Sequence, residues 1–199
     1  MISHKKYDKV DLYAHQSAKT GKDACGDSYY IKETKDYFLC ALADGLGSGM
    51  EARVSSQAAI SAIRDHADED VQSLMNRANK SLYNKRGAVL GLLKVYYEKR
   101  ELEYACVGNI RFVMYSPGGK ITHPLPKSGY LSGKPASFRV QRFPYEPDSS
   151  FLMHSDGLEI RSIKNIVWEL RSIKAASQKI RQLIDKPKDD VTFLIGKIG

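Results

Sequence analysis

The sequence predicts an α+β fold in which an antiparallel β-sandwich packs between helices. Short apolar runs bounded by turn residues recur along the chain, as β-strands do. Two stretches in the first half and one near the C-terminus instead place apolar residues at helical spacing. The resulting order is strands, two helices, strands, one helix and a last strand, and the short turns between strands favour antiparallel pairing.

The composition is that of an ordinary globular protein, with 42% hydrophobic and 27% charged residues. We expect a single domain over residues 1–199, because no repeat or linker divides the chain. No apolar run approaches the roughly 20 residues that span a bilayer, and the N-terminus lacks a signal peptide, so we expect a cytoplasmic protein without membrane contact. A net charge of +8 favours an acidic or phosphorylated partner.

The three cysteines are Cys25, Cys40 and Cys106, an odd number at wide spacing. Cys40 and Cys106 lie inside apolar runs, which is typical of buried free thiols in a reducing compartment. The spacing disfavours a zinc site.

The first strands lead to the central feature of the sequence. Alternating residues predict strands at 10–16 and 29–32, and the turn at 34–36 joins the second of these to an apolar run at 38–43. Asp27 opens the second strand and Asp44 ends the third. Since the start of one strand lies beside the end of the next in an antiparallel hairpin, we expect these two carboxylates to meet at one edge.

The apolar run at 38–43 is typical of a strand covered on both faces. Asp44 and Gly45 follow it directly. A carboxylate at such a rigid edge can hold a ligand, and a glycine leaves its carbonyl oxygen open to the same ligand. The design recurs at 151–157, where an apolar run ends in Asp156, and it is inverted where Asp189 leads into a strand at 191–195.

Two helices are expected after Gly49, the second over 70–85. The apolar face of the first is formed by Val54, Ala58, Ala59, Ile63 and Ala67, and that of the second by Val71, Leu74, Met75, Ala78 and Leu82.

The middle of the chain predicts strands at 87–97, 102–107 and 110–115, which we expect to form an antiparallel meander. Residues 124–147 carry five of the seven prolines and predict an irregular loop with one edge strand at 138–143. This loop is a candidate lid or substrate-recognition segment, or a surface connection without such a role.

A long amphipathic helix is expected from residue 163 to residue 184, ended by Pro187. Its polar face is basic and consists of Arg161, Lys164, Arg171, Lys174, Lys179 and Arg181. Such a face is ordinary for a solvated helix. It could also dock a phosphoprotein or, less readily, a nucleic acid.

Four carboxylates lie at predicted strand ends, namely Asp27, Asp44, Asp156 and Asp189. Together with the Gly45 carbonyl oxygen they make an all-oxygen ligand set, which suits Mg²⁺ or Mn²⁺. Without cations, converging carboxylates would repel one another and raise their own pKa values. Two divalent ions in such a site can activate water and stabilise the attacking and leaving oxygens of a phosphate ester.

Two other interpretations stay open at this point. The glycines at 45, 47 and 49 follow a strand and precede a helix, as in a dinucleotide-binding loop, although Met50 replaces the third required glycine and Asp44 would repel a pyrophosphate. A non-catalytic module could instead bind phosphorylated or nucleic-acid partners through the basic helix face. Its affinity would fall steeply with salt and would need no metal.

Six short motifs follow one another along the chain: Gly26-Asp27, Ala43-Asp44-Gly45, Gly-Ala-Val-Leu at 87–90, Val-Gly-Asn-Ile-Arg at 107–111, Ser155-Asp156-Gly157 and Asp-Asp-Val-Thr at 189–192. In their residues and their order they resemble the motifs of the metal-dependent PP2C-like serine/threonine phosphatases. The resemblance extends from about Val10 to the C-terminus. The resemblance implies a four-layer α-β-β-α sandwich, with central antiparallel sheets flanked by helices. It also implies a site for two Mn²⁺ or Mg²⁺ ions at one end of the sheets.

The resemblance further implies the roles of individual residues. Asp44 would bridge both metals, Gly45 would give its carbonyl oxygen to one of them, and Asp156 and Asp189 would complete the other. Asp27 would hold a metal-bound water. Water activated by the two metals would attack phosphorus directly, without a phosphoenzyme.

Other positions differ from those of many family members. Asp190 replaces a common Asn, and we expect it to support the ligands from behind. Asn109 replaces an Asp that helps to hold a third metal. Leu46 replaces a His proposed as general acid, so that protonation of the leaving group would fall to water. Only Lys19 and Lys22 precede the first acidic motif, where larger members place a phosphate-binding arginine, and phosphate recognition is unassigned.

The chain is similar in length and motif wording to small bacterial members of this family that act in the general stress response. That likeness implies phosphorylated STAS-domain scaffold proteins of the stressosome as substrates, dephosphorylated on serine or threonine as negative feedback. A reduced insert relative to larger members would leave the site open to a bulky folded substrate.

Overall fold

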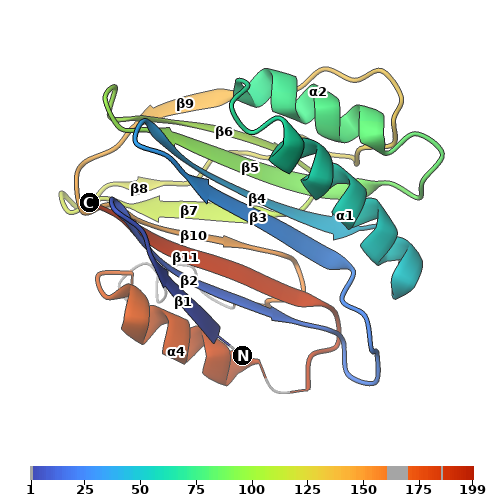
Figure 1. The fold of residues 1–199 in the computed structure, drawn as a ribbon. Coiled ribbons are helices and arrows are strands. Elements are labelled where there is room, and N and C mark those ends of the chain that lie inside the picture. Colours follow the sequence, from blue (N-terminus) through green and yellow to red (C-terminus); the bar gives the residue numbers. More distant parts are fainter. Residues whose placement is uncertain (1, 161–169, 185) are drawn as a thin grey trace.

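The computed structural model describes residues 2–160, 170–184 and 186–199. Two antiparallel β-sheets pack face to face, and helices cover their outer faces (Figure 1). The first sheet has six strands in the order β1-β2-β11-β10-β7-β8, and the second has five in the order β3-β4-β5-β6-β9. The predicted four-layer α-β-β-α sandwich is confirmed.

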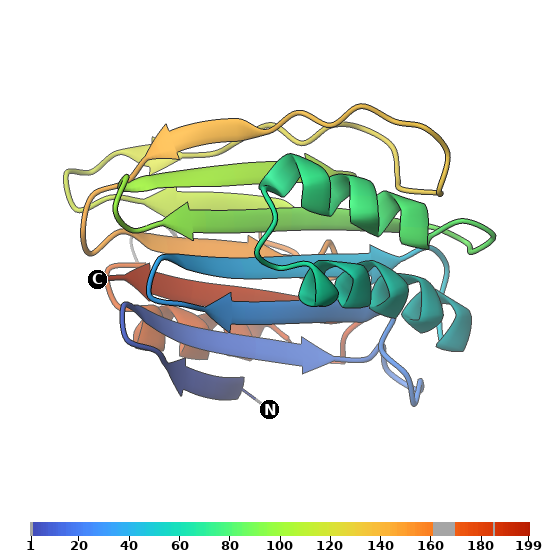
Figure 2. The same cartoon turned by 45° about the horizontal axis from the view of Figure 1, so that its top comes forward.

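The strands of the first sheet are β1 (Ile2–Lys6), β2 (Val10–Ser17), β7 (Arg111–Tyr115), β8 (Ile121–Thr122), β10 (Ser150–His154) and β11 (Val191–Ile198). The strands of the second are β3 (Asp27–Glu33), β4 (Tyr37–Gly45), β5 (Ala88–Tyr96), β6 (Glu101–Val107) and β9 (Gln141–Pro144). Helices α1 (Met50–Asp65) and α2 (Val71–Ser81) cover the second sheet, as Figure 2 shows, and α4 (Ile173–Leu183) covers the first. β2 pairs with β11 along its length, so the first sheet joins distant parts of the chain.

The central strand β4 is buried on both faces, as its unbroken apolar run predicts. Phe38 and Leu42 face the core between the sheets, whereas Leu39 and Ala41 face the core beneath α1 and α2. A third apolar core lies between the first sheet and α4. Because β4 packs against both cores, its C-terminal end, which carries Asp44, has a fixed position.

The predicted apolar face of α1 is confirmed at Ala59 and Ile63 but is wrong at Val54. Val54 was expected to be buried, yet it is 48% exposed, and the buried residues are Ala52, Ser55, Ser56, Ala59, Ile60 and Ile63. The apolar pattern missed part of this face because two of its members are serines. Each serine hydroxyl donates a hydrogen bond to a carbonyl oxygen of its own helix, to Glu51 O and Arg53 O, which makes its burial tolerable.

Helix α2 is capped by Asp70, the first residue of the predicted helix, whose side chain accepts a hydrogen bond from Ser73 N at 2.9 Å. Its predicted apolar face is confirmed as buried. The helix ends at Ser81 rather than at Lys85, and Asn84 then adopts a positive φ of 57°, which turns the chain toward β5.

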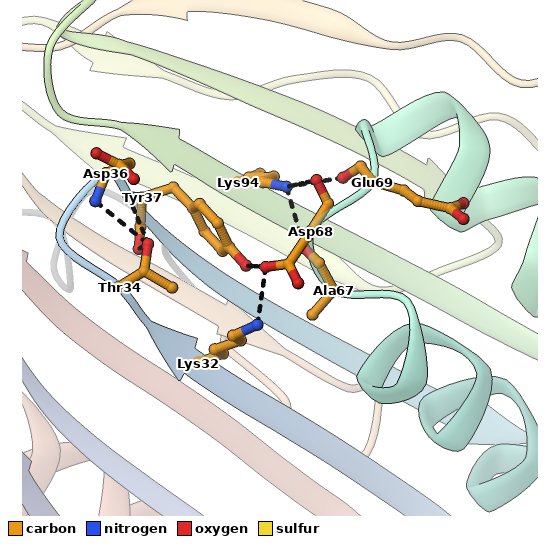
Figure 3. A network of polar contacts seen from close by, with 8 residues as sticks. All are labelled: Lys32, Thr34, Asp36, Tyr37, Ala67, Asp68, Glu69 and Lys94. Atoms are coloured by element: carbon orange, nitrogen blue, oxygen red, sulfur yellow. Dashed lines mark hydrogen bonds and ion pairs between the residues drawn. The ribbon is translucent and has the colours of Figure 1, made fainter.

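The connection between α1 and α2 is fixed to the second sheet by a buried lysine (Figure 3). Lys94 on β5 is only 2% exposed, and its Nζ donates hydrogen bonds to the carbonyl oxygens of Ala67 and Glu69 at 3.1 and 2.7 Å. The same Nζ lies 4.1 Å from the centre of the Tyr37 ring, and Tyr37 Oη donates to Asp68 Oδ1 at 2.5 Å. Burial lowers the pKa of Lys94. These contacts supply the polar partners that a buried ammonium group requires.

The predicted meander through residue 115 is wrong at its last step. The strands β3 to β6 follow one another in the second sheet, but β7 lies in the first sheet, where it pairs with β10 and β8. Gly108 has a φ of 104°, which redirects the chain after β6. The short link at 108–110 therefore crosses between sheets, although its length is that of a hairpin turn.

Two further expectations differ in their bounds, and one strand had not been expected. The edge strand of the proline-rich loop is confirmed as β9, paired with β6, but it covers Gln141–Pro144. β1 had not been predicted. The expected helix from residue 163 is described only as α4, with Ser172 as its N-cap; residues 161–169, including Arg161 and Lys164, lie outside the described residues.

The proline-rich loop is fastened to α2 by the buried Asn79. Its Oδ1 accepts hydrogen bonds from the backbone N–H groups of Ser132 and Gly133, both at 3.2 Å, and its Nδ2 donates to Lys134 O at 2.7 Å. This anchoring favours a fixed connection, and a lid role stays a prediction.

All three cysteines are unpaired thiols, and Cys40 and Cys106 are buried. None of the helices in the described ranges has the length and apolarity needed to cross a membrane.

Candidate metal centre

The ends of four strands place the predicted carboxylates at one end of the sandwich. In the β3–β4 pair Asp27 and Asp44 are direct partners, which confirms the expected meeting of these two residues. β10 ends at His154, opposite Phe193 at the start of β11. The segments that carry Asp156 and Asp189 therefore lie at the same end as Asp44 (Figure 1).

Asp27 is held by a hydrogen bond between the two sheets. It is 3% exposed, and its Oδ2 accepts a hydrogen bond from Ser155 Oγ at 2.8 Å. Ser155 Oγ in turn accepts from Thr192 N at 2.9 Å. Burial raises the pKa of Asp27 to about 6, against the lowering effect of the hydrogen bond from Ser155 and of the nearby Thr192. Asp27 Oδ1 has no hydrogen-bond partner within the described residues, so this oxygen is available to a ligand.

The charges of the other predicted ligands affect the pKa of Asp44. Burial raises its pKa to about 8, and the negative charges of Asp27, Asp156 and Asp189 act in the same direction. A divalent cation would reverse this balance, because it stabilises the ionised carboxylate. The raised pKa is the electrostatic signature expected of converging carboxylates without their counterions.

Asp156 and Asn109 form a direct pair. Asn109 Nδ2 donates a hydrogen bond to Asp156 Oδ2 at 2.7 Å. Burial raises the pKa of Asp156, and the charge of Asp189 raises it further. Asn109 follows β6 and Asp156 follows β10, so the bond joins the two sheets and fixes the orientation of the carboxylate.

Asp190 joins two loops near the carboxylates, and its expected role in supporting the ligands stays a prediction. Its Oδ1 accepts a hydrogen bond from Lys19 N at 2.8 Å, and its Oδ2 accepts from Gly26 N at 2.6 Å. Both carboxylate oxygens are thus engaged by backbone N–H groups. Asp190 thereby ties the loop before Asp27 to the loop before β11. Asp189 Oδ1 accepts from Asp190 N at 2.9 Å.

Gly45 is required by the close approach of α1. A Cβ atom at this position would lie 1.8 Å from the carbonyl oxygen of Ala52. Gly157 is similarly constrained, since its Cβ would lie 2.1 Å from Asp190 O. The Asp-Gly pairs therefore allow backbone segments to pass directly behind the carboxylates.

The donor set fits a hard divalent cation. All predicted donors are oxygens, one buried carboxylate oxygen of Asp27 lacks a partner in the part of the chain that the structure describes, and the ionised form of Asp44 is disfavoured without a cation. Within residues 2–160, 170–184 and 186–199, no three His, Cys, Asp or Glu side chains are grouped closely enough to hold a metal ion as they stand. The carboxylates thus interact through their charges, and their roles as ligands, with that of Gly45, stay predictions.

Sequence reasoning missed several residues of the site. Ser155 holds Asp27, and Gln16 Nε2 donates to Asp27 O at 3.0 Å. Arg53 lines a cavity together with Asp27. The position of Ser155 directly before Asp156 was a usable signal, whereas the contacts of Gln16 and Arg53 depend on which strands and helices lie side by side.

The sequence matches the family described as Stage II sporulation protein E (SpoIIE) over residues 34–198. Over all 199 residues, and over the whole relative, it is 38% identical to the phosphoserine phosphatase RsbX of Bacillus subtilis (strain 168). The chain belongs to the PP2C-like phosphatase family. The resemblance of its motifs to this family is confirmed, and as a member the chain is a protein serine/threonine phosphatase.

Solved structures of PP2C-like phosphatases agree with the fold. RsbX in complex with magnesium superposes with a TM-score of 0.95 at 38% identity and covers 100% of both chains. A chain from a structure described as the bacterial stressosome has a TM-score of 0.84 at 26% identity, covering 95% of this chain and 100% of that chain. The phosphatase PstP in complex with two manganese ions has a TM-score of 0.73 at 14% identity, covering 96% of this chain and 98% of that chain. This likeness shows the shared fold alone.

RsbX, which is 38% identical over its full length, was solved in complex with magnesium, one of the two predicted cofactor ions. The likenesses support neither a dinucleotide-binding domain nor a non-catalytic binding module.

Proposed function

We propose that this chain dephosphorylates phosphoserine or phosphothreonine on STAS-domain proteins of the stressosome, as negative feedback in the bacterial general stress response. The observation that carries the proposal is the pairing of Asp27 with Asp44 at the sheet edge, where the charges of Asp156 and Asp189 also raise the pKa of Asp44. The full-length likeness to a phosphoserine phosphatase and the likeness to a stressosome chain support the choice of substrate. The free cysteines are compatible with action in the cytoplasm.

The residues that would hold two Mn²⁺ or Mg²⁺ ions are Asp44, Asp156, Asp189 and the Gly45 carbonyl oxygen. When bound, such ions lower the pKa of water and neutralise charge on the phosphate oxygens. Asp190 and Asn109 would keep these ligands in position through the hydrogen bonds described above.

Asp27 would orient the attacking water. Its Oδ2 is fixed by Ser155, so its unpartnered Oδ1 has a defined position from which it can accept a hydrogen bond. Leu46 follows Gly45 and has no ionisable group, so the departing serine oxygen would take its proton from water.

Phosphate release from a phosphorylated STAS-domain protein tests this function. We expect release to need Mn²⁺ or Mg²⁺ and to fall about 100-fold or more in Asp44→Asn and Asp156→Asn. Asp148→Asn is the control, because Asp148 pairs with Lys197 beside the far ends of β10 and β11 and its positive φ of 66° suits Asn. Undiminished release in the site variants, or in the presence of a chelator, would rule the proposal out.

A further inference from the structure

A cavity of about 250 Å³ opens beside Asp27, between the start of α1 and the ends of β2 and β3. Its lining includes Gln16, Asp23, Cys25, Asp27, Arg53 and Gln57. The guanidinium group of Arg53 and the carboxylate of Asp27 therefore line the same cavity.

A second cavity, of about 560 Å³, continues from the first. The two share Gln16, Ser28 and Gln57, and the second extends to Tyr29, Ile60 and Arg64. Together they form one groove between α1 and β3, which we call the α1 groove. Arg53, Gln57, Ile60 and Arg64 are spaced four, three and four residues apart, so they lie on one face of the helix.

The negative charges around the site favour a positively charged side chain that contacts the substrate. A phosphate dianion that approaches Asp27 and Asp44 meets like charge, and it needs a positive partner that is not already neutralised. Arg86 lies near Gly47 but forms an ion pair with Glu51. Among the described residues Arg53 has no acidic partner, and it is exposed on the first turn of α1.

We propose that Arg53 binds the phosphate of the substrate and that the α1 groove holds the residues beside the phosphoserine; this rests on the proposed phosphatase function. Arg64 lies at the far end of the groove, about 16 Å from Arg53 at 1.5 Å per helical residue. An extended chain covers that distance in about five residues at roughly 3.3 Å each. The substrate segment thus carries an acidic residue about five positions from its phosphoserine.

Arg64 is available to such a residue. Its Nε pairs with Asp65 at 3.0 Å, but both side chains are 57% exposed. An exposed pair of neighbours is weak, so a substrate carboxylate can compete for the guanidinium group.

Two assays on the full chain separate this inference from the proposed function. Steady-state turnover uses phosphoserine peptides with Asp or Asn five positions to either side, together with p-nitrophenyl phosphate. Binding of the same labelled peptides is measured by fluorescence anisotropy with excess chelator, so that no turnover occurs. The variants are Arg53→Gln, Arg53→Lys, Arg64→Gln and, as a control of equal charge change on the neighbouring helix, Lys80→Gln.

We expect Arg53→Gln to raise KM for every substrate and to weaken peptide binding about tenfold, with a smaller change in kcat, and Arg53→Lys to restore part of the loss. Arg64→Gln should weaken binding only of the acidic peptide, about two- to fivefold. Lys80→Gln should match the wild type.

Wild-type turnover with unchanged KM and binding in Arg53→Gln would overturn the inference and leave the phosphatase function intact. Peptide binding that depends on Arg53, without turnover that depends on metal, would overturn the phosphatase function and leave binding through Arg53 intact. A wild-type chain that binds neither peptide would also overturn the inference.

Discussion

Asp27 and Asp44 are direct cross-strand partners at the end of the β3–β4 hairpin, and burial raises the pKa of both. Like charges directly opposite one another destabilise a sheet. The hairpin therefore places an unfavourable charge pair at the position where a cation would offset it, and folding and metal binding depend on the same two residues.

The stability of the metal-free protein should fall as pH rises from about 4 to about 8. The pKa values of Asp27 and Asp44 are about 6 and about 8 in the folded chain, above the 3.8 of the free side chain, so the folded state binds more protons over this range. Asp27 alone would contribute a loss on the order of 3 kcal/mol, at about 1.4 kcal/mol per pKa unit. Urea denaturation with chelator across this range measures it, and a flat profile would contradict the expectation. Excess Mn²⁺ should flatten the slope.

Asp44→Asn should stabilise the metal-free protein while it abolishes stabilisation by metal. The amide removes the charge that burial and the neighbouring carboxylates disfavour, and it removes a predicted ligand. Thermal melts with and without Mn²⁺ give both quantities. We expect a higher Tm without metal and a smaller shift on adding it; a full metal-induced shift in this variant would show that Asp44 is not a ligand.

Gly45→Ala should disrupt the contact between β4 and α1. The added methyl group would meet the Ala52 carbonyl oxygen at 1.8 Å, so the helix must move, at a cost of about 2 kcal/mol or more. Gly118→Ala is the matched control, since its methyl group would meet only the flexible Glu146 side chain, at 3.1 Å. Chemical denaturation of the two variants checks this, and equal losses would refute it.

Asp190→Asn should destabilise the loops around the site. Asp190 accepts hydrogen bonds from the N–H groups of Lys19 and Gly26, and an asparagine would direct its own NH₂ group at one of these donors. The expected cost is about 1–3 kcal/mol. Hydrogen exchange should become faster at Lys19 and Gly26 while exchange in α4 is unchanged. Uniform acceleration across the chain would indicate global destabilisation instead.

Lys94→Met should loosen the connection between α1 and α2. Methionine fills a similar volume but cannot donate to the carbonyl oxygens of Ala67 and Glu69, and leaving such groups unpaired costs about 1–3 kcal/mol. Hydrogen exchange at 66–70 reports the local opening. Lys80→Met, on exposed α2 surface, serves as the control.

Much of the fold could be predicted because short stretches of the sequence determine the strands and turns. The apolar run of β4 ends abruptly in Asp44-Gly45, and the turn at 34–36 sets the register that brings Asp27 opposite Asp44. The face of α1 could be predicted only in part from apolar spacing, because Ser55 and Ser56 occupy buried positions beside Ala59 and Ile63. The switch of β7 to the other sheet was also hidden, since a link of hairpin length can redirect the chain at a single positive φ.

The carboxylates of the candidate site could be predicted from the sequence, but the hydrogen bonds that hold them in place could not. Asp27, Asp44, Asp156 and Asp189 could be named because each adjoins an apolar strand. The bond from Ser155 to Asp27 joins residues far apart in the chain, and so does that from Asp190 to Gly26. Such contacts follow from sheet topology, which short-range patterns do not specify.

The pairing of β2 with β11 has a consequence for the order in which the chain folds. The second sheet with α1 and α2 is built almost entirely from neighbouring segments, which can assemble early, whereas β2 must pair with β11 from a distant part of the chain. Asp189 and Asp190 enter with that strand. The pair of Asp27 and Asp44 can therefore form early, whereas the complete set of carboxylates exists only after the slow pairing of β2 with β11 closes the first sheet.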